Sequence, residues 1–308
     1  MPQTEPQAEP RPSLADRAVD LALRSLLGLA MRMPYEARVR FMGAAVARAA
    51  GPLAGYRRRA LDNLSLVRPD WPDARRRAVA GEVLDNLGRT LIENYAWREL
   101  RARLAPGDAS GPGLAAVAEA QARGQGVILL TGHFGNHMTP IHALTQRGTR
   151  VGGMYRPMDN PLVNAHYAAT FEDLSGPSFP KGKRGNLRFV RHVAGGGAAM
   201  LLFDLRERSG IPLPFLGRPA LTATTGADLA LRYRALLVTA WGVRRPDRLG
   251  FDVVFDAPIP HSTGPAMMAE ATRRLERLVE AHPGQWFWVH RRWKGVSPEG
   301  LREAAPPP

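Results

Sequence analysis

Gly126-Val-Ile-Leu-Leu-Thr131, followed at once by Gly132-His133-Phe134-Gly135-Asn136, decides how this chain folds. The first segment is a short, continuous apolar run, which is typical of a strand buried on both faces of a sheet. The second contains two glycines and predicts a tight turn. A helical pattern covers 137–146, and Arg150 to Tyr155 forms the next predicted strand. Strand, turn, helix and strand in this order predict a βαβ unit of a parallel sheet.

The same alternation continues toward the C-terminus. Further strands are predicted at 198–204, 235–243, 251–255 and 286–293, and helices at 161–174, 186–193 and 265–281. The predicted fold class is therefore α/β, with a mostly parallel central sheet flanked by helices.

The first hundred residues have a different composition, rich in Ala and Leu, and predict a helical N-terminal part. Trp71-Pro72-Asp73 opens a long helix in which apolar residues recur every three or four positions. We expect a disordered tail over 1–12, a helical, membrane-facing region over 13–104, an α/β domain over 105–296 and a second tail over 297–308.

The charge balance indicates an anionic partner. The 308 residues carry 42 Lys and Arg against 28 Asp and Glu, a net charge of +14. Nucleic acid, anionic lipid and an acidic protein all fit such a charge. No pattern of a nucleic-acid-binding module is present, so a nucleic-acid partner is not expected. The absence of cysteine excludes disulfides, cysteine zinc sites and thiol catalysis.

Leu14 to Met33 is the most apolar N-terminal segment, but five charged residues interrupt it, so it does not predict a transmembrane helix. Its charges fall on one helical face, and apolar side chains fall on the opposite face. The charged residues are Arg17, Asp20 and Arg24, and the apolar ones Leu23, Leu26, Leu27 and Ala30. An amphipathic helix of this kind lies on a membrane or packs against its own domain, and the sequence favours neither.

Three polar clusters follow predicted strands, where the ligand site of an open α/β sheet lies. They are Thr131 to His137 with His133, Asn136 and His137; Tyr155 to Asn160 with Arg156 and Asp159; and Asp204 to Arg208 with Arg206 and Glu207. We expect them to lie together. A histidine, a guanidinium and carboxylates in one place indicate a site for acid–base chemistry and anion binding.

Five blocks in register now resemble a known family, the lipid A (lauroyl/myristoyl) and lysophospholipid acyltransferases. They are Asn63-Leu64 with Asn86-Leu87-Gly88-Arg89 and Glu93; Gly132 to Asn136; Tyr155-Arg156-Pro157-Met158-Asp159-Asn160-Pro161; Pro214-Phe215-Leu216-Gly217 with Ala220, Thr222 and Gly226; and Gln285 to Lys294. The resemblance covers about residues 36–295. It implies a glycerolphosphate-acyltransferase-like fold and transfer of a fatty acyl group from acyl carrier protein to a hydroxyl of a lipid A precursor or related anionic glycolipid.

The resemblance also implies roles and a location. His133 is the expected general base, Arg156 the ligand of a phosphate, and the backbone amides around Gly135 the stabilisers of the oxyanion. We further expect Asn136, His137, Arg184 and Arg206 to contact the substrate, with no metal and no cofactor. Arg184 belongs to a basic stretch that contacts either an anionic ligand or solvent. The expected location is the cytoplasmic face of the inner membrane, with peripheral or monotopic attachment to its anionic surface.

Two positions depart from the family pattern. After the histidine and four further residues the family has Asp or Glu, whereas this chain has Met138, which carries no charge. The family's usual acidic residue followed by Gln at the end of the third strand is here Asp204 followed by Leu205. Either Asp159, Asp204 or Glu207 reaches His133 from another loop and catalysis survives, or the protein is a degenerate paralogue that binds lipid or carrier without turnover. In the first case we expect Asp159 or Asp204 to complete the catalytic pair.

Overall fold

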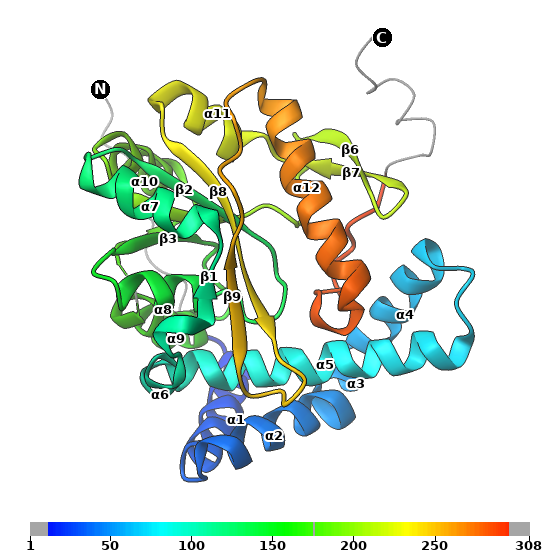
Figure 1. The fold of residues 1–308 in the computed structure, drawn as a ribbon. Coiled ribbons are helices and arrows are strands. Elements are labelled where there is room, and N and C mark those ends of the chain that lie inside the picture. The colour runs from blue at the N-terminus through cyan, green and yellow to red at the C-terminus, as the bar shows by residue number, and fades with distance from the viewer. Residues whose placement is uncertain (1–11, 175, 296–308) are drawn as a thin grey trace, which may run out of the picture.

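The computed structural model describes residues 12–174 and 176–295 (Figure 1). Within these residues, a seven-stranded sheet has the order β1-β9-β8-β2-β5-β3-β4. The strands are β1 (Ala109–Ser110), β2 (Val127–Thr131), β3 (Val151–Tyr155), β4 (Ser178–Pro180), β5 (Ala198–Leu202), β8 (Leu236–Arg244) and β9 (Phe251–Phe255). Only the β8–β9 pair in this sheet is antiparallel, so the prediction of a mostly parallel sheet is confirmed.

Strand β2 lies at the centre, parallel to both β5 and β8, and all five of its residues are buried. Its side chains alternate between two apolar clusters: Ile128 and Leu130 belong to one, Val127 and Leu129 to the other. This alternation is what a strand covered on both faces requires. The covering helices are α7 (Pro112–Ala122), α8 (Thr139–Thr145), α9 (Pro161–Leu174), α10 (Lys183–Ala194), α11 (Thr225–Tyr233) and α12 (Gly264–Ala281).

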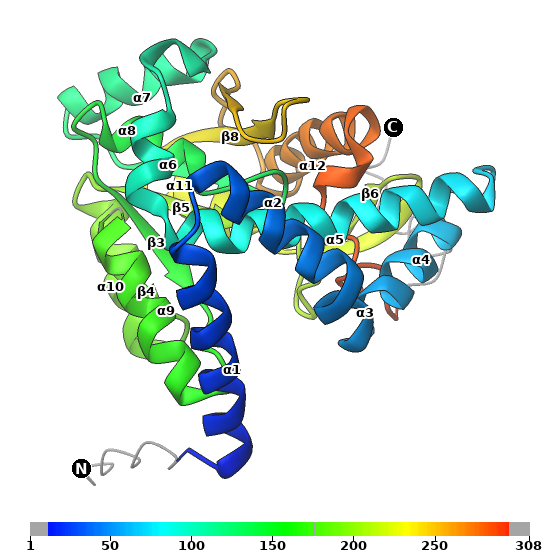
Figure 2. The same ribbon diagram turned by 90° about the horizontal axis from the view of Figure 1, so that it is seen from below.

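The N-terminal part is helical, as predicted. It consists of α1 (Leu14–Met31), α2 (Tyr35–Ala45), a π-helical turn (Val46–Ala50), α3 (Gly51–Leu53), α4 (Tyr56–Val67), α5 (Asp73–Tyr95) and α6 (Trp97–Arg103). Helix α5 crosses one end of the sheet in both views (Figures 1 and 2). Its Val83 and Leu84 share a core cluster with the sheet, so α5 forms part of the wall on which the site is built.

The strand predicted at 286–293 is wrong. After a 3-10 turn (Pro283–Gln285) the chain makes successive turns, which bring Trp286, Trp288 and Trp293 into one aromatic cluster. The ring centroid of Trp286 lies 4.9 Å from that of Trp288 and 5.9 Å from that of Trp293. A strand would place positions 286 and 293 on opposite faces, so burial of all three indoles on one side excludes it.

A two-stranded hairpin, β6 (Ile211–Phe215) and β7 (Arg218–Thr222), was not predicted. Its two-residue loop, Leu216-Gly217, has positive φ at both positions, 52° and 75°. That backbone is the one a tight hairpin needs, but leucine disfavours it. The local sequence signal was therefore weak.

Candidate active site

The centre of the site is a pair formed by His133 and Asp204. Thr131 at the end of β2 and Leu202 at the end of β5 are partners in the parallel register. His133 and Asp204 each lie two residues beyond these partners, so the sheet places them side by side. The Nδ1 atom of His133 lies 2.8 Å from Oδ1 of Asp204.

Asp204 is held as a carboxylate. Its side chain is 1% exposed, and Oδ2 accepts hydrogen bonds from the backbone N–H of His133 at 2.8 Å and from Nε1 of Trp286 at 2.9 Å. Burial alone would raise the pKa of Asp204, but the charge of His133 and these hydrogen bonds outweigh it and lower the pKa to about 2. An ionised Asp204 accepts a hydrogen bond from the Nδ1–H of His133 and leaves Nε2 available to a substrate.

The turn after His133 is clamped by its neighbours. The carbonyl of Gly135 accepts hydrogen bonds from Thr90 at 3.0 Å and from Asn86 at 3.2 Å, both on α5. Gly135 has φ of 53°, and a Cβ there would lie 1.9 Å from the carbonyl oxygen of Gly242. Only glycine permits this approach, so the glycine is needed for the turn and not for loop flexibility.

A buried ion pair, which the sequence did not single out as part of the site, supports the same turn. Glu93 on α5 is fully buried, and both its carboxylate oxygens accept from Arg244 at the end of β8. Glu93 also accepts from the side chain of Asn136 at 2.9 Å, and Arg244 donates to Asn86 at 2.7 Å. The sequence signal that could have identified this pair was Glu93, a charged residue on the apolar side of a predicted helix.

Asn136 consequently lies inside the protein. It is fully buried, and its Oδ1 accepts the backbone N–H of Met138 at 3.0 Å while its Nδ2 donates to Glu93. Both ends of the amide are used, so Asn136 supports the turn instead of facing a ligand, in contrast to the substrate contact expected from the sequence.

The backbone amides of the turn are also engaged. The N–H groups of His133, Phe134, Gly135 and Asn136 donate, in that order, to Asp204, Gly132, Gln285 and Gly242. The expected oxyanion site around Gly135 is therefore corrected, because these four donors already have acceptors within the protein.

A cavity of about 180 Å³ opens beside His133. Its wall is mostly apolar and comes from α5, from the turn at 133–137, from Tyr167 of α9 and from the loop after α12. The lining residues are Val83, Asn86, Leu87, Thr90, Leu91, Asn94, His133, Gly135, His137, Tyr167, Gln285, Trp286 and Phe287. His133 itself is 27% exposed, so it is accessible from this cavity.

His137 lines the same cavity, with its ring centroid 5.5 Å from that of His133. Burial, and next the charge of His133, lower the pKa of His137 to about 3. It is therefore neutral near pH 7 and adds no charge beside His133. Among the described residues, no group of three or more His, Asp or Glu side chains is arranged to hold a metal ion.

Met138 is fully packed away from this cavity. It is 1% exposed and belongs to the apolar cluster on the other face of the sheet, with Leu100, Ile141 and Leu144. The residues that line the cavity do not include it. The carboxylate that meets His133 comes from Asp204, at the end of a neighbouring strand, and not from the turn itself.

Arg156 and Asp159 lie apart from the pair. They follow β3, which is separated from β2 by β5. Their side chains are 81% and 96% exposed and contact each other at 3.5 Å. Of the two carboxylates expected to complete the pair, Asp204 meets His133 and Asp159 does not.

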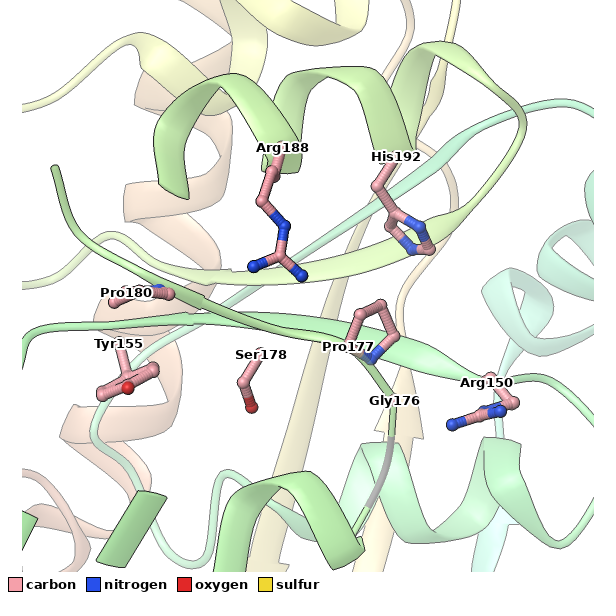
Figure 3. Close-up of a pocket in the computed structure, with 8 residues that line it drawn as sticks. All are labelled: Arg150, Tyr155, Gly176, Pro177, Ser178, Pro180, Arg188 and His192. Atoms are coloured by element: carbon pink, nitrogen blue, oxygen red, sulfur yellow. The ribbon is translucent and has the colours of Figure 1, made fainter. Parts of the chain in front are cut away.

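The remaining basic candidates lie around the third cluster and on α10. The Nε of Arg206 is buried without a hydrogen-bond partner in the described residues, and Glu207 pairs with Lys181 at 3.5 Å. Arg184 is exposed on α10. A larger, open cavity of about 690 Å³ runs between α10, β3 and β4, where Arg188 and His192 extend from the helix toward the strands (Figure 3). His133 does not line this second cavity.

Comparison with known proteins places the sequence among those of one enzyme family. The family of bacterial lipid A biosynthesis acyltransferases matches residues 11–295. The chain is 26% identical over 250 residues to the lipid A biosynthesis lauroyltransferase of Escherichia coli (strain K12), which covers 78% of this chain and 79% of that protein. It is 22% identical over 243 residues to the lipid A biosynthesis acyltransferase of Haemophilus influenzae, covering 76% and 74%.

Proposed function

The chain belongs to the bacterial lipid A biosynthesis acyltransferases, and from this premise we propose that it moves a fatty acyl group from acyl carrier protein to a hydroxyl of a lipid A precursor or related lipid. The contact between His133 and Asp204 carries the proposal. It supplies the acid–base pair that Met138 had put in question. A degenerate paralogue without turnover was suggested only by that methionine, so the intact pair favours an active enzyme.

The proposed reaction begins with Nε2 of His133, which takes the proton of the acceptor hydroxyl. The hydroxyl oxygen forms a bond to the thioester carbon, and the carbonyl electron pair moves onto its oxygen. Collapse of this intermediate breaks the carbon–sulfur bond, and the leaving thiolate receives the proton from His133. Asp204 stabilises the charged imidazole between the two proton transfers and fixes its tautomer.

The acceptor is anionic, and we assign its phosphate groups to Arg156, Arg184 and Arg206. Among the described residues, the partner of Arg156 is an exposed carboxylate, an ion pair of little strength, so a phosphate can replace Asp159. A guanidinium binds phosphate through two parallel hydrogen bonds, which lysine cannot reproduce. His137 lies beside His133 and contacts the bound acyl donor or acceptor.

We place the enzyme on the cytoplasmic face of the inner membrane, attached peripherally through α1. No described helix is long and apolar enough to cross a membrane. One charge of α1 points inward: Asp20 is buried and pairs with Arg24 at 2.9 Å and with His166 of α9 at 3.4 Å, whereas Arg17 and Arg24 are themselves exposed.

One exposed stripe of α1 carries no charge, with the exposed Arg17 and Arg24 beside it. Leu14, Leu21 and Leu29, spaced by seven and eight residues, are 83%, 67% and 54% exposed. Ala18, Ala22 and Ser25 lie exposed between them. The face opposite to the one that the sequence indicated is thus free for lipid, because Leu27 and Ala30 pack in the protein and Leu23 and Leu26 pack against them.

An acyl-transfer assay with purified protein, fatty acyl carrier proteins of several chain lengths and a lipid A precursor tests the function. We expect transfer by the wild type and a loss of about 10²–10⁴-fold in kcat for both His133→Ala and Asp204→Asn, because each removes the general base or its correct tautomer. Near-full activity of either variant would contradict the assigned pair. A wild type without transfer to any acceptor would contradict the function.

A further inference from the structure

Helix α5 directs three polar side chains toward the site at intervals of four residues: Asn86, Thr90 and Asn94. This spacing places them on one face of the helix. The first two hold the turn through the carbonyl of Gly135. Asn94, one helical turn further along, lines the same cavity but makes no hydrogen bond to the turn.

Asn94 is 5% exposed, and its Oδ1 is buried without a hydrogen-bond partner in the described residues. Nor does its Nδ2 donate to any residue that the structure describes. A buried amide without partners costs stability, and such groups are rare in folded proteins. The unpaired Oδ1 of Asn94 therefore lowers the stability of the fold.

The other two amides that line the cavity are fully engaged, which sets Asn94 apart. Asn86 accepts from Nε of Arg244 at 2.7 Å and donates to the carbonyl of Gly135. Gln285 accepts from the backbone N–H of Arg244 and donates to its carbonyl, both at 2.8 Å. Of the side-chain amides in this wall, Asn94 alone is available to a ligand.

The proposed reaction needs such a donor. The tetrahedral intermediate carries negative charge on the former carbonyl oxygen, and acyl-transfer sites stabilise it with preorganised N–H groups. The four backbone N–H groups from His133 to Asn136 already have acceptors in the protein. His133 itself is occupied with the proton of the acceptor.

We infer that Asn94 is a catalytic residue whose side-chain Nδ2 donates a hydrogen bond to the thioester carbonyl oxygen as that oxygen becomes an oxyanion. The inference rests on the proposed acyl transfer. As His133 takes the acceptor proton and the new carbon–oxygen bond forms, the carbonyl electron pair moves to the oxygen facing Asn94. When the intermediate collapses, this pair re-forms the carbonyl and the thiolate leaves with the proton from His133. Rotation of the Asn94 amide by half a turn exchanges Oδ1 and Nδ2 without repacking, so Nδ2 can face the ligand. The terminal torsion of asparagine is roughly two-fold, which permits this exchange.

Two variants of the full-length enzyme test the role: Asn94→Ala removes the amide, and Asn94→Asp keeps its shape but replaces the donor by an acceptor. We expect kcat to fall about 10²–10³-fold in Asn94→Ala, the typical effect of losing one oxyanion donor, with little change in KM. Asn94→Asp is expected to lose at least as much, because a carboxylate repels the oxyanion. The melting temperature of Asn94→Ala is expected to equal or exceed that of the wild type, because an unpaired buried group is gone.

Gln125→Ala is the matched control, since the Gln125 amide donates a hydrogen bond to the carbonyl of Arg234 at the opposite end of β2. The kcat of this variant should be that of the wild type. A structural role for Asn94 predicts the reverse pattern, a lowered melting temperature with unchanged kcat. A rise in KM alone would show binding of the ground state and would overturn the oxyanion assignment while leaving the proposed function standing. Failure of the wild type to transfer any acyl group would overturn both.

Discussion

At the scale of single residues, the carboxylate of the site comes from the end of a strand next to β2. Asp204 contacts both the side chain and the backbone N–H of His133, so it fixes the ring and the turn together. The position that carries an acid in the family holds Met138, which is buried among apolar side chains. Nδ1 of His133 therefore already has its partner, and a second carboxylate has no place to act.

A carboxylate at position 138 should be harmful. In Met138→Glu the new group enters the apolar cluster around Leu100 and Ile141. Burial of such a group costs several kcal/mol or raises its pKa until it is neutral. We expect a lower melting temperature and no gain in transfer rate, measured by thermal denaturation and the acyl-transfer assay.

Met138→Leu is the control for volume, because exchanges of similar apolar side chains usually cost less than about 1.5 kcal/mol. If Met138→Glu instead transferred faster than the wild type at an unchanged melting temperature, position 138 would act on His133 after all.

At the scale of elements, α1 packs against α9 through a buried polar contact and leaves a row of leucines exposed. Asp20 is bound to Arg24 and to His166 of α9, and Asn160 donates to the backbone carbonyl of Asp16 at 2.9 Å. Figure 2 shows α1 extending alongside α9. Tyr167, next to His166, lines the cavity of the active site. The helix proposed to meet the membrane is thus anchored to the helix that covers part of the site.

Leu21→Glu should weaken attachment to lipid, since it places a charge in the middle of the exposed apolar face. We expect the wild type to float with vesicles of phosphatidylcholine and phosphatidylglycerol, and less so as salt rises, because salt screens exposed charges within about 10 Å at 0.1 M. Leu21→Glu should remain largely unbound under the same conditions.

Leu187→Glu on α10 is the matched control, because it changes the net charge equally at another exposed leucine, 50% exposed. Equal loss of flotation in both variants would show that charge alone binds the vesicles. Wild-type protein that fails to float at any salt concentration would contradict attachment through α1.

At the scale of the whole molecule, two histidines that follow the turn after β2, His137 and His142, have their pKa lowered by burial. His142 is fully buried beside Arg101, and burial, followed by the charge of Arg101, lowers its pKa to about 3. The pKa of His137 is lowered to about 3 as well. Both take up protons on unfolding at mildly acid pH, because an unfolded histidine has a pKa near 6.5.

The free energy of unfolding should therefore fall as the pH drops below about 6.5, and continue to fall toward pH 3. Each histidine contributes a slope approaching about 1.4 kcal/mol per pH unit, since the unfolded state binds the additional proton. Melting temperatures measured from pH 8 to pH 4.5 test this. His142→Gln keeps an acceptor for Arg101. It should reduce the dependence of stability on pH by the contribution of about one proton taken up on unfolding. A melting temperature that does not change between pH 7 and pH 5 would show that these histidines are protonated in the folded protein.

The sequence by itself determined the local features. The apolar run before His133 specified a buried strand, and the alternation of strands and helices specified a mostly parallel sheet, because both depend on the period of neighbouring side chains. The strand Phe251–Phe255 has the predicted bounds, and the helix predicted to open at Trp71-Pro72-Asp73 begins at Asp73. The position of His133 after a strand was likewise readable from the chain.

Only the tertiary structure decided which residue meets which. Asp204 rather than Asp159 reaches His133 because β5, and not β3, is the neighbour of β2, and the order of strands is not encoded in local spacing. The inward turn of Asn136, the packing of Met138 and the outward face of α1 depend on the same long-range arrangement. The local sequence does not fix which way each of these side chains points. The surrounding contacts of the folded chain decide it.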